Sequence, residues 1–310
     1  MTKSVDETQA LINEGLYYEY TQAADPLYSG YISKIPFTKF NRELYAAGKT
    51  RIIPLDISEQ LKCTAPATSP ALCANFVRIL AHENLSTCFN ATSQLLYIIR
   101  GSGHTQFGDI MIPWQQGDFI ALPTGETAKH FADTEAIFYL IHDEPLLRYL
   151  GVSADIPRFK PTLYTNESCL RELKKAGEDA KAANRSRISV LLANKAMDQT
   201  LTVTHTLWAM LGILPKGAIQ LPHRHQSVAL DLILDCQEGC YTLVGTDISA
   251  EGKILNPTRV DWQPYSAFIT PAGYWHAHYN ESSQAAHLIP IQDAGLHTYL
   301  RSLDIKFVTG

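Results

Sequence analysis

The sequence contains an internal repeat, and this duplication constrains its fold more than any other feature. The first copy runs from Trp114 to His130 as WQQGDFIALPTGETAKH, and the second runs from Trp262 to His278 as WQPYSAFITPAGYWHAH. The tryptophan, a Pro-x-Gly turn and the final histidine keep the same spacing in both copies. A chain of 310 residues has room for two domains of about 100–200 residues each. The repeat therefore predicts two tandem copies of one folding unit.

Both copies have the pattern of short β-strands. Apolar runs rich in β-branched and aromatic residues lie at 95–100, 136–141, 206–214 and 229–234. Glycine, proline and asparagine turn signals separate these runs. Many short strands at such spacing predict an all-β fold in which each copy forms a barrel or a sandwich.

Two segments favour helix instead, residues 5–25 and the charged, alanine-rich residues 166–184, for which Asn166 is a candidate N-cap. They lead to a division of the chain into four parts. We expect an N-terminal arm at 1–60, a first barrel at 61–160, a helical linker at 161–190 and a second barrel at 191–310.

Composition narrows the class of protein. The net charge is −5 and no basic tract is present, so a nucleic acid is not expected as a partner. No apolar run of about 18 residues exists and the N-terminus is polar, which predicts a cytoplasmic protein without a membrane partner. The aromatic clusters at 16–20 and 26–31 favour a homo-oligomer, a dimer or a tetramer, in which the arm packs on a neighbour; the alternative is that the arm covers its own barrels.

The second copy concentrates histidines. His223 and His225 are two residues apart, so on a strand both side chains point to the same face. His276 and His278 follow in the repeated segment. Neutral imidazole is a common ligand of transition metals, and inside a barrel these rings can converge on one ion. We predict a metal site formed by His223, His225 and His276.

These residues resemble the two-part motif of the cupin family, G(x)5HxH followed by PxG(x)2H(x)3N. The matching positions are Gly217, His223, His225, Pro271, Gly273, His276 and Asn280. The resemblance implies two jelly-roll barrels, a bicupin, over about residues 60–310. It also implies that the metal ligands are the HxH pair, a glutamate shortly after it and the later histidine. The string HRHQSVAL is similar to the gentisate 1,2-dioxygenase branch of bicupins, whose sites have three histidines and no carboxylate.

The sequence departs from the family pattern at two places. The glutamate position falls at Ala229 or Leu230, and the neighbouring Asp231 is the alternative carboxylate ligand. In the branch that the sequence resembles, the first barrel usually carries the iron. Here the corresponding positions of the first copy are Cys88, Asn90 and Ala128, which predicts that the first barrel is metal-free. The first copy keeps the barrel signature without the ligands, so barrel packing does not by itself require histidines there.

The resemblance implies an Fe(II) dioxygenase that opens the ring of a small aromatic hydroxy acid of the gentisate, salicylate or hydroxynaphthoate kind. Fe(II) is the expected metal, with Zn, Mn and Ni as alternatives. His278 and His205 are the candidate catalytic residues, acting on the bound small-molecule substrate, although His278 has a structural alternative because His130 persists in the copy without ligands. Gln220 and Tyr241 are further cavity candidates. The rival hypotheses are a non-oxidative metal-dependent isomerase, lyase or hydrolase, and a metabolite-binding cupin without turnover.

Overall fold

The computed structural model describes residues 5–179 and 187–308. The chain divides into two compact units after residue 34. The first unit contains the helices α1 (Val5–Asn13) and α2 (Tyr20–Ala23), where the sequence predicted helix. No helix of the described residues is long and apolar enough to cross a membrane. The predicted oligomer and the predicted cytoplasmic location stay predictions.

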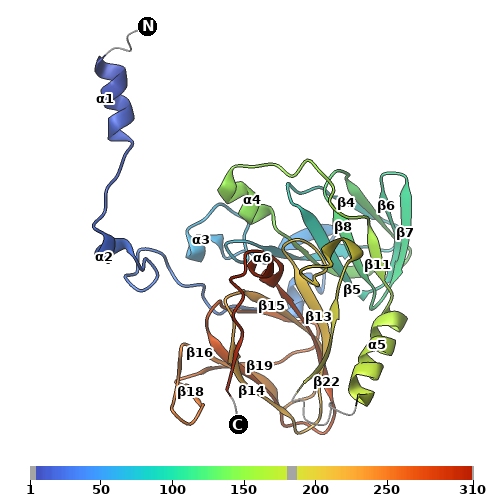
Figure 1. Cartoon of the computed structure of the whole chain (residues 1–310). Helices are drawn as coiled ribbons and strands as arrows, with labels where there is room; N and C mark the ends of the chain where they lie inside the picture. Colours follow the sequence, from blue (N-terminus) through green and yellow to red (C-terminus); the bar gives the residue numbers. More distant parts are fainter. Residues whose placement is uncertain (1–4, 180–186, 309–310) are drawn as a thin grey trace. The chain divides into compact units, whose positions relative to one another are not determined.

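The second unit begins with a barrel built from two antiparallel sheets (Figure 1). The larger sheet has the order β11-β8-β5-β10-β3-β2 and the smaller one has the order β4-β9-β6-β7. In chain order these strands are β2 (Arg51–Pro54), β3 (Cys73–Ile79), β4 (Asn84–Thr87), β5 (Ser93–Arg100), β6 (Ser102–Phe107), β7 (Ile110–Gln115), β8 (Phe119–Pro123), β9 (Ala128–Ala132), β10 (Ala136–His142) and β11 (Thr162–Tyr164). The helical elements beside them are η1 (Arg42–Tyr45), α3 (Ser58–Leu61) and α4 (Glu144–Leu150).

The second barrel repeats this arrangement. Its larger sheet has the order β1-β20-β15-β22-β13-β12 and its smaller sheet has the order β19-β16-β21-β14-β23, with the hairpin β17-β18 beside them. These strands are β1 (Lys39–Phe40), β12 (Ile188–Leu192), β13 (Trp208–Leu214), β14 (Ile219–Arg224), β15 (Ala229–Asp235), β16 (Cys240–Gly245), β17 (Asp247–Ile248), β18 (Ile254–Leu255), β19 (Thr258–Asp261), β20 (Ala267–Thr270), β21 (Trp275–Asn280), β22 (Ala286–Gln292) and β23 (Lys306–Phe307). The helical elements η3 (Lys195–Met197) and α6 (Ala294–Tyr299) accompany them. The all-β prediction of two tandem barrels is confirmed.

The larger sheets bury both of their faces, which explains the uninterrupted apolar runs in the sequence. Along β5, Leu95, Tyr97 and Ile99 belong to a core shared by the two barrels. Leu96 and Ile98 alternate with them and belong to the interior of the first barrel. Since successive side chains of a strand point to opposite faces, a strand between two cores has apolar residues at every position.

The segment after residue 34 supplies strands to both barrels. β1 pairs with β20 of the second barrel, and β2 pairs with β3 of the first. Between them, the Tyr45 hydroxyl donates a hydrogen bond of 2.9 Å to the carbonyl oxygen of Tyr265. This part of the arm therefore covers the chain's own barrels. Because residues 35–310 form one compact unit, the four sequence-based boundaries stay predictions.

The predicted linker contains a strand as well as a helix. β11 joins the edge of the first barrel at β8. The helix α5 (Asn166–Glu178) follows, and the Thr165 side chain caps it by accepting a hydrogen bond of 3.2 Å from the backbone N–H of Ser168. The candidate cap Asn166 was wrong by one position, because Thr165 keeps the extended backbone that an N-cap needs and Asn166 is the first helical residue. The predicted continuation of the helix at 180–184 lies outside the described residues.

Candidate metal centre

A cavity of about 270 Å³ lies in the second barrel and is lined by strands of both its sheets. Its volume is near the lower end of the range for small-molecule pockets, about 300–1,000 Å³. The polar lining includes four histidines together with one cation, one carboxyl group and two amides: His223, His225, His276, His278, Arg187, Asp231, Gln220 and Gln292. The predicted ligands and the cavity candidate Gln220 thus border one space.

A β-bulge brings two of these side chains into the cavity together. In the pairing of β14 with β21, Gln220 lies opposite His278 and His223 lies opposite His276, so β14 contains one extra residue. On a regular strand, residues three positions apart would point to opposite faces. The extra residue restores the alignment, and the proline at position 222 fits there because a bulge leaves one backbone N–H out of the ladder.

Three of the histidines direct the same ring nitrogen at a backbone carbonyl. The Nδ1 atom of His223 lies 3.0 Å from the Leu221 oxygen, and that of His276 lies 3.1 Å from the Tyr274 oxygen. The Nδ1 atom of His225 lies 2.8 Å from the Ser227 oxygen. A carbonyl oxygen can only accept, so Nδ1 carries the proton in each ring and Nε2 keeps its lone pair. This is the arrangement that orients an imidazole as a metal ligand.

The distances group the rings differently from the sequence prediction. Ligand atoms of His223, His276 and His278 all lie within 4.8 Å of one another. The centroid of the His225 ring lies 4.9 Å from that of His276 and 6.3 Å from that of His223, and the centroid of the His278 ring lies 5.7 Å and 5.8 Å from the same two rings. Ligand-atom distances therefore group His278 with His223 and His276, although the His225 ring lies nearer to His276 than the His278 ring does.

The hydrogen bonds of His278 differ from those of the other three rings. Its Nδ1 lies 2.8 Å from the Thr242 hydroxyl, and that hydroxyl also accepts a 2.8 Å hydrogen bond from Trp262 Nε1. A hydroxyl has a proton to donate, so Nδ1 of His278 can accept it. The proton of the neutral ring is then on Nε2.

The first barrel contains a second copy of this arrangement in which the proton positions can be deduced. The Thr87 hydroxyl donates to Gln94 Oε1 at 2.7 Å, so it accepts from Nε2 of His130 at 3.0 Å. Nδ1 of His130 then accepts from Thr105 at 2.8 Å, and Thr105 accepts from Trp114 Nε1 at 3.0 Å. By this equivalence, His278 is an Nε2–H donor.

Burial keeps the whole cluster neutral. Loss of solvation lowers the pKa of His225 to about 4, and it lowers the pKa of His223, His276 and His278 well below 6.5. Neighbouring imidazoles and the Arg187 guanidinium add to the effect. Neutral rings at pH 7 are the form that binds a metal ion.

Ala229 and Asp231 lie where a carboxylate ligand was considered. Ala229 lines the cavity and has no ligand atom. Asp231 accepts a 2.7 Å hydrogen bond from the Thr270 hydroxyl and is outside the group of side chains that cluster as candidate ligands in the described part of the chain. Burial raises the pKa of Asp231 to about 6.

Two of the sequence candidates lie elsewhere. His205 is outside the lining of the cavity, and its ring centroid lies 6.0 Å from that of Phe159. Tyr241 stacks on Tyr279 and donates a 2.7 Å hydrogen bond to Glu281 Oε1. The structure brings neither residue to the four histidines.

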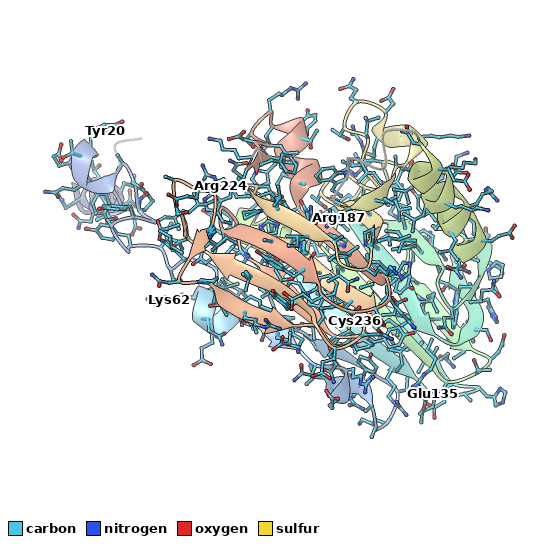
Figure 2. All side chains as sticks on the ribbon, turned by 90° about the horizontal axis from the view of Figure 1, so that it is seen from below. Tyr20, Lys62, Glu135, Arg187, Arg224 and Cys236 are labelled. Carbon is cyan, nitrogen blue, oxygen red and sulfur yellow. The ribbon has the colours of Figure 1, made fainter. Side chains whose placement is uncertain are left out.

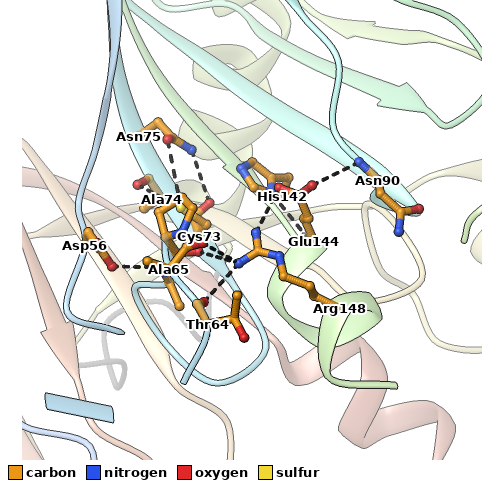
Figure 3. A network of polar contacts seen from close by, with 12 residues as sticks. Asp56, Thr64, Ala65, Cys73, Ala74, Asn75, Asn90, His142, Glu144 and Arg148 are labelled. Carbon is orange, nitrogen blue, oxygen red and sulfur yellow. Dashed lines mark hydrogen bonds and ion pairs between the residues drawn. The ribbon is translucent and has the colours of Figure 1, made fainter. Parts of the chain in front are cut away.

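The first barrel differs from the sequence alignment by one residue. Cys88 and Asn90 are exposed, whereas Thr87 is buried beside His130 and Phe89 packs on the barrel core. Figure 3 shows Asn90 beside Glu144, to whose side chain its backbone N–H donates. The expectation that Cys88 and Asn90 occupy the ligand positions was therefore wrong, because the turn after β4 shifts the inward-facing positions by one residue.

Two parts of the cavity wall were missed in the sequence. Arg187 directly precedes β12 and lines the cavity; it is labelled in Figure 2. At the C-terminus, β23 pairs with β14, and the Phe307 ring stacks on His223 with centroids 5.7 Å apart. Neither segment belongs to the repeat, so no sequence pattern pointed to them.

Two paired barrels of this topology form a bicupin fold. Similar solved structures include salicylate 1,2-dioxygenase from Pseudoaminobacter salicylatoxidans, 14% identical over 99% of each chain with a TM-score of 0.72. Its adduct with gentisate covers 100% of this chain and 96% of that chain at 14% identity, with a TM-score of 0.73. A cupin 2 conserved barrel domain protein from Leptotrichia buccalis is 16% identical, covers 84% of this chain and 97% of its own, and has a TM-score of 0.51. No family model and no curated protein matches the chain. These likenesses confirm the predicted bicupin fold.

Proposed function

We propose that the protein is an Fe(II)-dependent dioxygenase that opens the ring of a small aromatic hydroxy acid. The observation that carries the proposal is the set of three Nε2 lone pairs, from His223, His225 and His276, that border one cavity. Their donor chemistry fits a divalent transition metal. When bound, Fe(II) supplies open coordination positions at which a chelating substrate and O₂ react together. The fold likeness to salicylate 1,2-dioxygenase supports this class of reaction.

Arg187 supplies the positive charge of the pocket. Burial lowers its pKa to about 10, so the guanidinium stays protonated at neutral pH. Within residues 5–179 and 187–308, its guanidinium donates a hydrogen bond of 3.2 Å to the sulfur of Met210, a weak acceptor. A carboxylate is the stronger partner, and guanidinium binds carboxylate through two parallel hydrogen bonds. Arg187 therefore orients an anionic aromatic substrate by its carboxylate.

His278 holds the proton that the reaction needs close to the reacting atoms. Its Nε2–H points to the same cluster as His223 and His276, so it donates to an oxygen atom of the substrate or of O₂. The hydroxyl of Thr242 fixes this orientation. Ile305 and Phe307 close one side of the cavity with apolar atoms and limit the entry of water.

Oxygen uptake tests the proposal. The Fe(II)-loaded protein is incubated without oxygen with gentisate, salicylate or 1-hydroxy-2-naphthoate, and O₂ is then admitted. Because both oxygen atoms of O₂ enter the product, one O₂ should disappear for each ring whose absorbance is lost. His223→Ala should abolish both signals, whereas the matched control His205→Ala, outside the cavity, should keep them. Absence of uptake with all three acids would refute the proposed reaction.

A further inference from the structure

The cavity contains a buried carboxyl group that the proposed reaction does not use. Asp231 is 2% exposed and lies on β15, two residues beyond Ala229 and on the same face of the strand. Its carboxyl group accepts a hydrogen bond from Thr270, and the Arg187 guanidinium acts on it electrostatically without an ion pair between them. Burying an ionised carboxylate with so few hydrogen-bond donors costs free energy, so a ligand that supplies another donor is favoured.

A second acceptor in the same wall also lacks a partner. Gln220 is 8% exposed, and its Oε1 atom is buried without a hydrogen bond. The other end of the amide, Nε2, lies 3.3 Å from Nε2 of His223. Because Gln220 lines the cavity, a small turn of its amide would offer Oε1 as an acceptor to a ligand's N–H or O–H group.

The polar groups of the cavity thus favour two different kinds of ligand group. Arg187 attracts an anion, whereas Asp231 and Gln220 demand hydrogen-bond donors. The pKa of Asp231, about 6, leaves most of its carboxyl group ionised at pH 7, so a second anionic group on the ligand would be repelled. Buried polar groups that a ligand leaves unpaired cost more affinity than a missing apolar contact does.

We propose that Asp231 selects an aromatic hydroxy acid that carries an amino group on its ring, in addition to the carboxylate held by Arg187. The ring amine donates to the Asp231 carboxylate and to Gln220 Oε1. This inference rests on the proposed function for the carboxylate and the ring. It adds the substituent that distinguishes the substrate from a simple hydroxybenzoate.

Calorimetric titration of the Fe(II)-loaded protein without oxygen tests the inference by affinity. The ligands are salicylate as reference, its 3-, 4- and 5-amino derivatives, and 5-sulfosalicylate as the anionic analogue. We expect the tightest amino isomer to bind about tenfold more strongly than salicylate, the usual effect of one charge-assisted hydrogen bond. We expect 5-sulfosalicylate to bind more weakly than salicylate.

Asp231→Asn is the matched variant, because it keeps the shape of the side chain and removes the charge. In this variant the amino isomers should bind no more tightly than salicylate, and 5-sulfosalicylate should bind more tightly than it binds to the wild type. Asp231→Ser tests the same loss of charge with a smaller side chain. If neither variant folds, the order of ligand affinities measured on the wild-type protein decides the question.

The outcomes separate this inference from the proposed reaction. Equal affinities of wild-type protein for salicylate and all amino isomers, or an amino preference that survives in Asp231→Asn, would overturn the role of Asp231. An amino preference without O₂ uptake would leave Asp231 as the selector and remove the dioxygenase. Binding of none of these acids would overturn both.

Discussion

At the scale of single residues, the position of one proton separates His278 from the histidines around it. His223, His225 and His276 each direct Nδ1–H at a carbonyl oxygen, whereas Nδ1 of His278 accepts from Thr242. A ring with its proton on Nε2 cannot offer that nitrogen to a metal ion. The ligand set thus follows from hydrogen-bond chemistry, although the ligand atoms that lie within 4.8 Å of one another belong to His223, His276 and His278.

Metal content of single variants distinguishes the two possible triads. We expect His223→Ala, His225→Ala and His276→Ala to retain less than about a tenth of the iron, because each removes one of three ligand nitrogens. His278→Ala should keep it. Elemental analysis of the purified, reconstituted proteins measures both. Loss of iron in His278→Ala together with retention in His225→Ala would mean that the tight geometric cluster is the ligand set.

Thr242, whose hydroxyl contacts His278, can be compared with its counterpart in the first barrel of the same protein. Thr242→Val removes the donor to Nδ1, so the ring loses its fixed tautomer and Nε2–H is no longer assured. We expect O₂ uptake to fall at least about tenfold with metal content unchanged, since removal of a positioned donor has effects of that size or more. Thr105→Val makes the same change at His130 in the first barrel and should leave uptake unaltered. Equal losses in the two variants would indicate a structural role for both threonines.

At the scale of elements, the C-terminal strand completes the wall of the cavity. β23 has only two residues, yet it pairs with β14 where His223 lies, and Phe307 stacks on that ring. Phe307 is 63% exposed, so it contributes more to the cover of the site than to the core.

Replacing Phe307 should affect substrate binding more than it affects protein stability. We expect Phe307→Ala to raise KM for the aromatic acid several-fold, because one wall of the pocket opens to water, while the midpoint of thermal unfolding changes little. Steady-state O₂ uptake and a thermal melt measure the two effects. Tyr299→Ala on α6 removes an equally exposed aromatic ring outside the cavity lining and serves as the control. A drop in thermal stability without a change in KM would assign β23 to the fold alone.

Sequence patterns predicted the elements better than their details. The repeat from Trp114 and Trp262 defined both barrels, since equivalent spacing of strands and turns survives large changes of side chain. It failed at the turn after β4, where a shift of one residue exchanged Cys88 for Thr87 on the inner face. Arg187 was not found because it contacts the site through tertiary structure alone, and no local pattern records such contacts.

At the scale of the whole molecule, the two barrels are joined by more than their linker. β1 and β2, from one short segment, belong to different barrels, and one apolar core lies between the larger sheets. Substitutions in either barrel should therefore change the stability of the entire unit. This makes buried groups of the first barrel, far in sequence from the candidate site, relevant to how the protein responds to acid.

His130 and His142 provide such groups in the first barrel. Burial lowers the pKa of each to about 3, and Arg148 adds to the effect at His142. In the unfolded chain both titrate near 6.5, so below that pH the unfolded state binds more protons than the folded state. The contribution of the two neutral rings to the free energy of unfolding is greatest above about pH 6.5 and decreases as the pH falls below that value. Asp231 and Asp293 oppose this trend, because burial raises their pKa to about 6 and about 7.

Urea unfolding of the metal-free protein at several pH values isolates one of these histidines. Between pH 6 and pH 5 the wild type should lose about 1 kcal/mol more stability than His142→Gln, because glutamine binds no proton in either state. Above about pH 7.5 the two proteins should show the same slope, since the histidine is neutral both folded and unfolded. Glutamine can still accept the Glu144 backbone N–H, which lies 3.4 Å from Nδ1 of His142. If the two slopes also coincide between pH 6 and pH 5, His142 is protonated in the folded barrel and its burial does not hold it neutral.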